Sequence, residues 1–152
     1  MERQTRALPQ EDLAALLGLV VVVDGELLAG RLPPELTERL ISRLLPAGAS
    51  AGELNAALSD LAQRLHWAAG HGVDHPPPMR HTGHELAVPA GAVAACVAAL
   101  REMGAESVRE EPGPMIVAAF PELAPDPAYE RRVEQLTALA ATCGGEYRGA
   151  SW

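Results

Sequence analysis

All five histidines of this 152-residue chain fall within nineteen consecutive residues: His66, His71, His75, His81 and His84. Neutral imidazole is a common metal ligand, and its charge changes near neutral pH. The types and spacing of these residues therefore suggest two kinds of chemistry, metal binding and proton sensing.

The spacing within the cluster disfavours a metal site. His71 and His75 would share a face only in a helix, and the three prolines that follow, Pro76–Pro78, disfavour a helix there. His81 and His84 form a second pair, but no Cys or carboxylate stands at a known ligand spacing beside them. We expect a polar loop. A metal-binding or pH-sensing module is the weaker alternative, with His71, His75, His81 and His84 as its ligands.

No other residue type forms a recognisable catalytic pattern. Cys96 and Cys143 lie on predicted apolar helix faces, where burial raises the pKa of a thiol and makes it unreactive. Glu110 and Glu111 would point to opposite faces of a strand, so they do not form a carboxylate pair. The sequence predicts no catalytic residue and no cofactor.

The composition limits the class of partner. The net charge is −8, all twelve basic residues are Arg, and only 3% of the residues are aromatic. An acidic chain with few stacking side chains is unsuited to nucleic acid, but it suits a basic protein partner. The apolar run Leu13–Val23 is about half the ~20 residues that span a bilayer. We expect a bacterial, cytoplasmic protein that contacts no membrane.

The elements that must position these residues divide near residue 70. Residues 1–70 are predicted to form a mainly helical N-terminal extension. Its first helix is expected at Glu11–Leu17, and Asp24-Gly25, flanked by apolar runs, predicts a possible β-hairpin. Pro33-Pro34 and a capping box at Ser50–Glu53 open two further helices.

Residues 71–152 follow a sharper order. Strands are predicted at 84–88, 106–111, 115–120 and 146–150, and helices at 90–103 and from Asp126-Pro127 to Cys143. This βαββαβ order is that of a ferredoxin-like α+β domain. In that topology the first and third strands are central. The charged second strand then lies at an edge, where charge opposes pairing with other chains.

The C-terminal residues resemble those of the regulator of ribonuclease activity B (RraB) family. That family ends with a helix, a Gly-Gly pair, an acid, Tyr, Asp, Gly and Trp, and the matching positions here are Gly144, Gly145, Glu146, Tyr147, Gly149 and Trp152. Arg148 replaces the usual Asp, and Ala150-Ser151 separate Gly149 from the Trp. The resemblance covers residues 70–152. The expected role of the motif is structural, because glycines end the helix and Tyr147 packs inward.

The resemblance implies a non-catalytic regulator that binds another protein. Family members bind an endoribonuclease, RNase E, and restrain RNA cleavage by protein–protein contact. We expect Glu106, Glu110 and Glu111, on the second strand, to form a contact surface for a basic partner. Another alternative is a small-ligand-binding or enzymatic ferredoxin-like dimer, which would need a concave polar pocket on the sheet.

Overall fold

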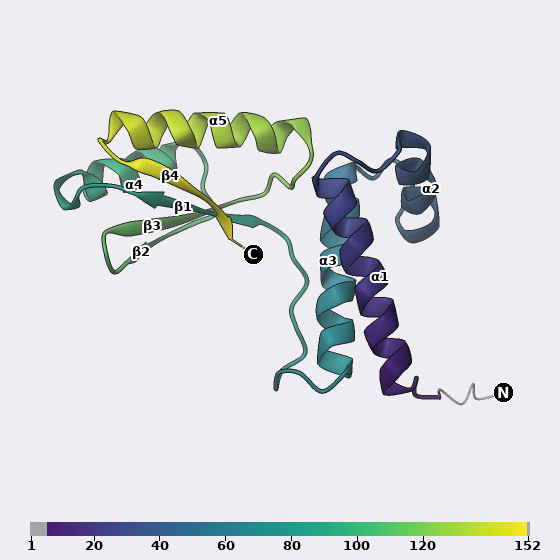
Figure 1. Cartoon of the computed structure of the whole chain (residues 1–152). Coiled ribbons are helices and arrows are strands. Elements are labelled where there is room, and N and C mark those ends of the chain that lie inside the picture. The colour runs from purple at the N-terminus through teal and green to yellow at the C-terminus, as the bar shows by residue number, and fades with distance from the viewer. Residues whose placement is uncertain (1–5, 152) are drawn as a thin grey trace. The chain divides into compact units, whose positions relative to one another are not determined.

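The computed structural model describes residues 6–151 and shows an α+β protein (Figure 1). The chain divides into two compact units, residues 1–78 and 79–152, each with its own core. The boundary follows Pro78, whereas the sequence placed it after residue 70. The segment between Ala68 and Thr82, which holds Pro76–Pro78, contains neither helix nor strand.

The first unit consists of α1 (Gln10–Leu28), α2 (Pro34–Leu44) and α3 (Ala51–Ala68). Helices α1 and α3 run antiparallel side by side (Figure 1), and the Gln10 side chain at the start of α1 donates a hydrogen bond to the Ala69 carbonyl, 2.8 Å away. We call this unit the helical unit. Its core is a cluster of leucines from α1 and α3, with α2 side chains packed against it: Leu27, Leu54 and Leu58, with Leu40 and Ile41.

The hairpin prediction at Asp24-Gly25 is wrong. Helix α1 continues through both residues to Leu28, and the helix predicted to end at Leu17 is its first part. The four consecutive valines Val20–Val23 have low helix propensity because their side chains are β-branched. Packing compensates, since Val20, Val23 and Leu27 gain burial against α3. Asp24 is also accommodated, because its carboxylate accepts a hydrogen bond from Ser59 of α3 at 3.0 Å.

The capping box predicted at the start of α3 is confirmed. The Ser50 hydroxyl accepts a hydrogen bond from the Glu53 N–H at 3.1 Å, and the Glu53 carboxylate accepts one from the Ser50 N–H at 2.7 Å. Two backbone donors at the helix end are therefore satisfied reciprocally. This interaction fixes where α3 begins.

The second unit, which we call the sheet unit, contains β1 (Thr82–Ala87), β2 (Ser107–Glu111), β3 (Met115–Phe120) and β4 (Glu146–Ser151). Helices α4 (Val93–Glu102), preceded by a 3-10 turn at Ala90–Ala92, and α5 (Pro127–Thr142) complete it. The strands form one antiparallel sheet in the order β2-β3-β1-β4. Strands β3 and β1 are therefore the two central strands.

The core of the sheet unit lies between the sheet and its helices. Helices α4 and α5 lie on the same side of the sheet (Figure 1), and Leu100 and Leu136 from them meet Leu86, Ile116 and Phe120 from the strands. Strand β3 is buried over five of its six residues, as expected for the most apolar strand. Strand β2 is at an edge, and only Val108 within it is partly buried.

Candidate functional site

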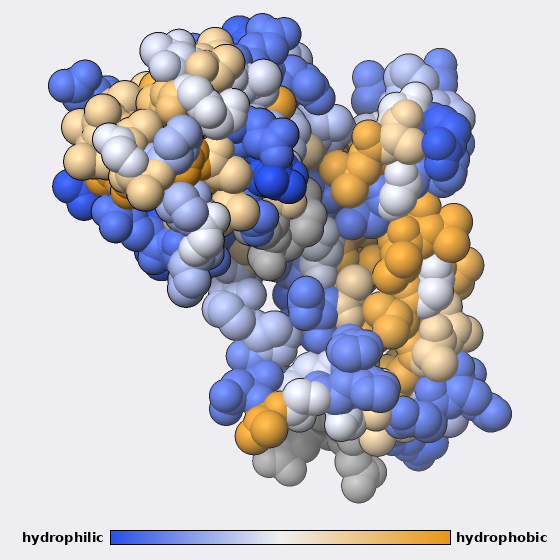
Figure 2. Space-filling view, turned by 60° about the vertical axis from the view of Figure 1, so that its left-hand side comes forward, coloured by the Kyte–Doolittle hydropathy of each residue, from blue (hydrophilic) through white to orange (hydrophobic). Residues whose placement is uncertain are grey.

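The outward face of α1 is the main exposed apolar surface of the helical unit. Leu16, Leu19, Val21 and Val22 expose 39%, 65%, 54% and 64% of their surface. Figure 2 shows hydrophobic side chains gathered on the helical unit. A helix that is apolar on all sides is normally covered on all sides. We call Leu16, Leu19, Val21 and Val22 the α1 face.

At about 100° per residue, Leu16, Leu19 and Val22 run from the margin of the packed stripe to the outer side of α1, and Val21 lies on the other flank of that stripe. Leu13, Leu17 and Val20, at helical spacing, are partly buried, and Leu27 continues this inner stripe to full burial. No charged residue stands between Asp12 and Asp24, so the centre of the face is neutral. Its N-terminal end is acidic, because Glu11 and Asp12 are both exposed. The arrangement suits a partner with an apolar surface and a nearby cation.

A second group of functional side chains surrounds His84 in the core of the sheet unit. His84 on β1 is fully buried, and its Nδ1 lies 2.7 Å from the Tyr147 hydroxyl. Tyr147 is in turn hydrogen-bonded to Tyr129 of α5. The ring centres of Phe120, Tyr129 and Tyr147 lie within about 6 Å of the His84 ring. Three of the five aromatic residues in the chain thus converge on one imidazole.

The electrostatics of the cluster keep His84 neutral. Burial lowers its pKa from 6.5 to about 4; nearby Glu122 opposes this shift and Arg132 adds to it. The His84 Nε2 is buried and has no hydrogen-bond partner in the protein. The polar loop expected for the histidines as a cluster is wrong for His84, whereas the strand predicted at 84–88 does contain it. Its alternation with Leu86 on a strand was the available signal of an inward position.

An ion pair lies beside the aromatic cluster. The Arg132 guanidinium donates two hydrogen bonds to the Glu122 carboxylate, at 2.8 and 3.3 Å, and lies 4.2 Å from the centre of the Phe120 ring. Both charged side chains are largely buried. Burial is the largest single influence and raises the pKa of Glu122, but the hydrogen bonds and charge of Arg132, a backbone hydrogen bond and the neighbouring His84 together outweigh it, and the pKa is lowered. The pair fixes the segment before α5.

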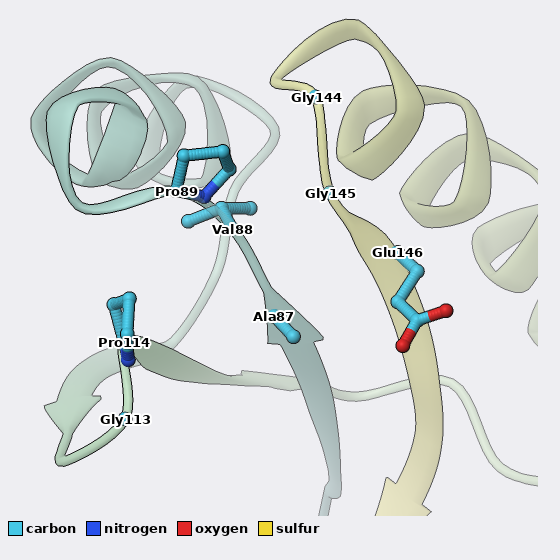
Figure 3. Close-up of a pocket in the computed structure, with 8 residues that line it drawn as sticks. All are labelled: Ala87, Val88, Pro89, Gly113, Pro114, Gly144, Gly145 and Glu146. Atoms are coloured by element: carbon cyan, nitrogen blue, oxygen red, sulfur yellow. The ribbon is translucent and has the colours of Figure 1, made fainter.

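The Gly-Gly motif links α5 to β4 and lies against the backbone at the end of β1. Gly144, at φ +78°, and Gly145 line an open hollow of about 410 Å³ with Pro89 and Pro114 (Figure 3). A Cβ on Gly145 would overlap the Ala87 carbonyl oxygen and lie 2.8 Å from the Val88 Cα. These contacts support the structural role expected for the glycines.

The remaining residues of the tail motif have different surroundings. Glu146 lines the hollow, and its carboxylate pairs with Arg148 at 2.7 Å. Gly149 has φ +116°, near the irregular register between β1 and β4. Trp152 lies outside the described residues. The hollow is at the end of β1 and β4, and backbone-rich positions line it, so it differs from the polar sheet pocket that a small-ligand dimer would need.

The acidic residues expected to contact a partner lie together along the β2 edge. Glu106 precedes β2, Glu110 and Glu111 lie within it, and all three are exposed. Glu106 faces His81 at 3.6 Å, and Glu111 faces Arg109 at 3.6 Å. The Arg109 guanidinium therefore offsets part of the negative charge. We call Glu106, Glu110 and Glu111 the acidic edge.

The histidines proposed as metal ligands contact different side chains. The His71 ring stacks on His66 with centres 4.2 Å apart, His75 packs against Trp67, and His84 is buried against Tyr147. Within residues 6–151, no group of three or more His, Cys, Asp or Glu is arranged to hold a metal ion. The metal-site alternative therefore has no geometric support.

None of the helices in residues 6–151 has the length and apolar character needed to cross a bilayer.

Comparisons with known proteins found no match. No family model matches the chain, and neither a curated protein nor a solved structure is significantly similar to it. The resemblance of the tail to the RraB family therefore stays a prediction.

Proposed function

We propose that the chain is a non-catalytic protein-binding module, and that its partner docks on the α1 face. The observation that carries this proposal is the exposure of Leu16, Leu19, Val21 and Val22 on a helix whose inner stripe is already packed against α3. Covering four such side chains, each about half exposed, is worth several kcal/mol before the costs of association. That is enough to anchor a partner.

The chemistry of the face defines the partner. Its centre is neutral over the eleven residues from Leu13 to Val23, so the partner must present an apolar surface there. Glu11 and Asp12 favour a basic group at the N-terminal end of α1. A nucleic-acid backbone meets neither requirement, because it is charged along its whole length.

An endoribonuclease is the partner class we propose, on the strength of the tail resemblance. We further propose that the sheet unit is a ferredoxin-like domain of the RraB type. The element order β1-α4-β2-β3-α5-β4 and the strand order β2-β3-β1-β4 support this assignment. Two free thiols are in keeping with a cytoplasmic location.

Purified RNase E provides the direct test. Binding of the full chain is measured by calorimetry, and cleavage of a defined RNA is measured with and without the chain. Leu19→Glu places a charge at the centre of the α1 face, and we expect it to weaken binding at least tenfold. Gln63→Glu is the matched control, because it adds the same charge at an exposed position of α3.

Each outcome distinguishes one part of the proposal. Binding that survives Leu19→Glu but is lost when Glu106, Glu110 and Glu111 are changed to Arg would move the contact to the acidic edge. Equal weakening by Leu19→Glu and Gln63→Glu would show a general charge effect and reject the α1 face. Absence of both binding and inhibition by the wild-type chain would reject the ribonuclease as the partner.

A further inference from the structure

The two cysteines, 47 positions apart in sequence, lie together in the sheet unit. Cys96 on α4 is fully buried, and Cys143 directly follows the last residue of α5 and is half-buried. The two thiols are hydrogen-bond partners, and Cys143 packs against the core cluster that contains Cys96. The sequence predicted two separate apolar positions. Their meeting depends on α4 and α5 covering the same face of the sheet.

We propose that Cys96 and Cys143 form a redox-active dithiol, which small-molecule disulfides oxidise reversibly to an intramolecular disulfide. Two thiols that interact directly within one packed cluster are near enough for a modest movement to bring them to bonding geometry, and both are free in the structure. Within residues 6–151 they are the whole set of cysteines, so the pairing has one possible connectivity.

The oxidation takes place in two exchange steps. The Cys143 thiolate attacks one sulfur of the small disulfide, forms a mixed disulfide and releases one small thiolate. Cys96 then loses its proton, its thiolate attacks the Cys143 sulfur, and the second small thiolate leaves. The protein gives up two electrons and two protons, and the small disulfide is reduced to two thiols. Cys143 is the first nucleophile because it is the more exposed of the two.

The second step limits the rate. Burial, with smaller contributions from the neighbouring Cys143, raises the pKa of Cys96 to about 11. Few Cys96 thiolates are present at neutral pH, so ring closure is expected to speed up about tenfold for each pH unit below the pKa. A slow, pH-dependent closure distinguishes this pair from two independent surface thiols.

The disulfide would join the C-terminal end of α5 to α4 and close a loop of roughly fifty residues. Such a loop restricts the unfolded chain strongly. We expect the oxidised sheet unit to melt roughly 10 °C higher than the reduced one. The Gly144-Gly145 join directly follows Cys143, so the link would also fix the end of α5 beside the hollow.

The test uses the reduced full-length chain and oxidised glutathione at pH 7, 8 and 9. Samples are quenched with acid and treated with N-ethylmaleimide after neutralisation. The mass of the intact protein is then measured by mass spectrometry. We expect a product that has lost two hydrogens, carries neither glutathione nor maleimide, and returns to the dithiol with dithiothreitol. Cys96→Ser should stop at a single glutathione adduct, and Cys143→Ser should stay unmodified.

Three results would overturn the proposal. They are a wild-type chain that stops at the mixed disulfide at pH 9, one that keeps two alkylatable thiols, and one that forms only intermolecular disulfides. Circular dichroism of each Ser variant shows whether it is folded. The wild-type masses and the melting temperatures of its two redox states decide the question even if a variant does not fold.

Discussion

At the scale of single residues, His84 and Gly145 are the positions whose surroundings allow the least change. His84 is a polar group enclosed by three aromatic rings and satisfied on one nitrogen only. Gly145 lies against backbone, which cannot turn aside as a flexible side chain can. The stability of the sheet unit should therefore depend on pH through His84, and on side-chain volume at position 145.

Acid should destabilise the sheet unit through His84. Its pKa is about 4 in the folded chain and 6.5 when unperturbed, so between these values the unfolded chain binds a proton that the folded chain does not. The free energy of unfolding therefore falls as the pH drops below 6.5, by about 2 kcal/mol between pH 7 and pH 5, and is unaffected by His84 above 6.5.

Urea unfolding of the wild-type chain and His84→Gln at several pH values measures this effect. The variant keeps the contributions of every other titrating group, including Glu122. The difference in free energy between the two chains should shrink by about 2 kcal/mol from pH 7 to pH 5. A difference that stays constant would show that His84 does not titrate as a buried neutral group.

Adding one methyl group at Gly145 should destabilise the sheet unit by about 3 kcal/mol, because the strand ends would have to separate. Gly91→Ala is the control, since nothing lies within 4 Å of its added Cβ. Thermal melting of both variants measures the contrast. Equal melting temperatures would mean that β1 and β4 are not joined as closely as described.

The sequence predicted the roles of single residues better than their contacts with residues far along the chain. Gly144, Gly145 and Tyr147 were expected to serve the fold, and their contacts support that role. The meeting of Cys96 with Cys143, and of His84 with Tyr129 and Tyr147, was not foreseen. These contacts join segments tens of residues apart, and no local spacing encodes them.

At the scale of elements, α1 shows how tertiary packing overrides local signals. An Asp-Gly pair between apolar runs favours a hairpin, because glycine supplies the positive φ of the turn. Gly25 is instead in a helix, and its φ is not in the positive range. The inward stripe from Leu13 to Leu27 is the signal that prevails, since α3 offers it a partner.

Gly25→Ala distinguishes the two structures by the sign of its effect. In the α1 helix the added methyl meets nothing within 4 Å, and alanine should stabilise the helical unit by about 0.5–1 kcal/mol. In a hairpin turn the same change would destabilise it. Chemical denaturation followed by circular dichroism gives the sign directly.

Elements of the sheet unit were predicted more accurately. The strand Met115–Phe120 was expected with these bounds, and the other strands begin or end within two residues of expectation. Proline and glycine mark the ends of these elements, as at Pro127 and Gly144, so their limits are local. In the helical unit, Gly18 and Gly25 lie inside α1 without ending it, which is why the length of α1 was underestimated.

At the scale of the whole molecule, the chain has two separate hydrophobic cores. Leucines at helix–helix contacts form the core of the helical unit, and side chains between sheet and helices form that of the sheet unit. The predicted division near residue 70 and the observed one after Pro78 both fall in the proline-containing segment. Composition alone could locate that segment, because it can form neither helix nor a regular strand pair.

Core truncations should act within one unit at a time. Leu58→Ala removes a buried side chain from the helical unit, and Leu136→Ala removes one from the sheet unit; each should cost about 2–5 kcal/mol. Hydrogen exchange followed by mass spectrometry should show faster exchange in residues 10–68 for the first and in residues 82–151 for the second. Uniform acceleration throughout the chain by either variant would contradict separate cores.

The contact between Gly145 and the Ala87–Val88 backbone also predicts how this protein diverges in evolution. A lineage can exchange apolar side chains in both cores and change every charge on β2 while the fold persists. It cannot place any side chain at position 145 without parting β1 from β4. Among distant relatives, an invariant glycine two residues before the tyrosine that faces His84 should outlast most other sequence identity.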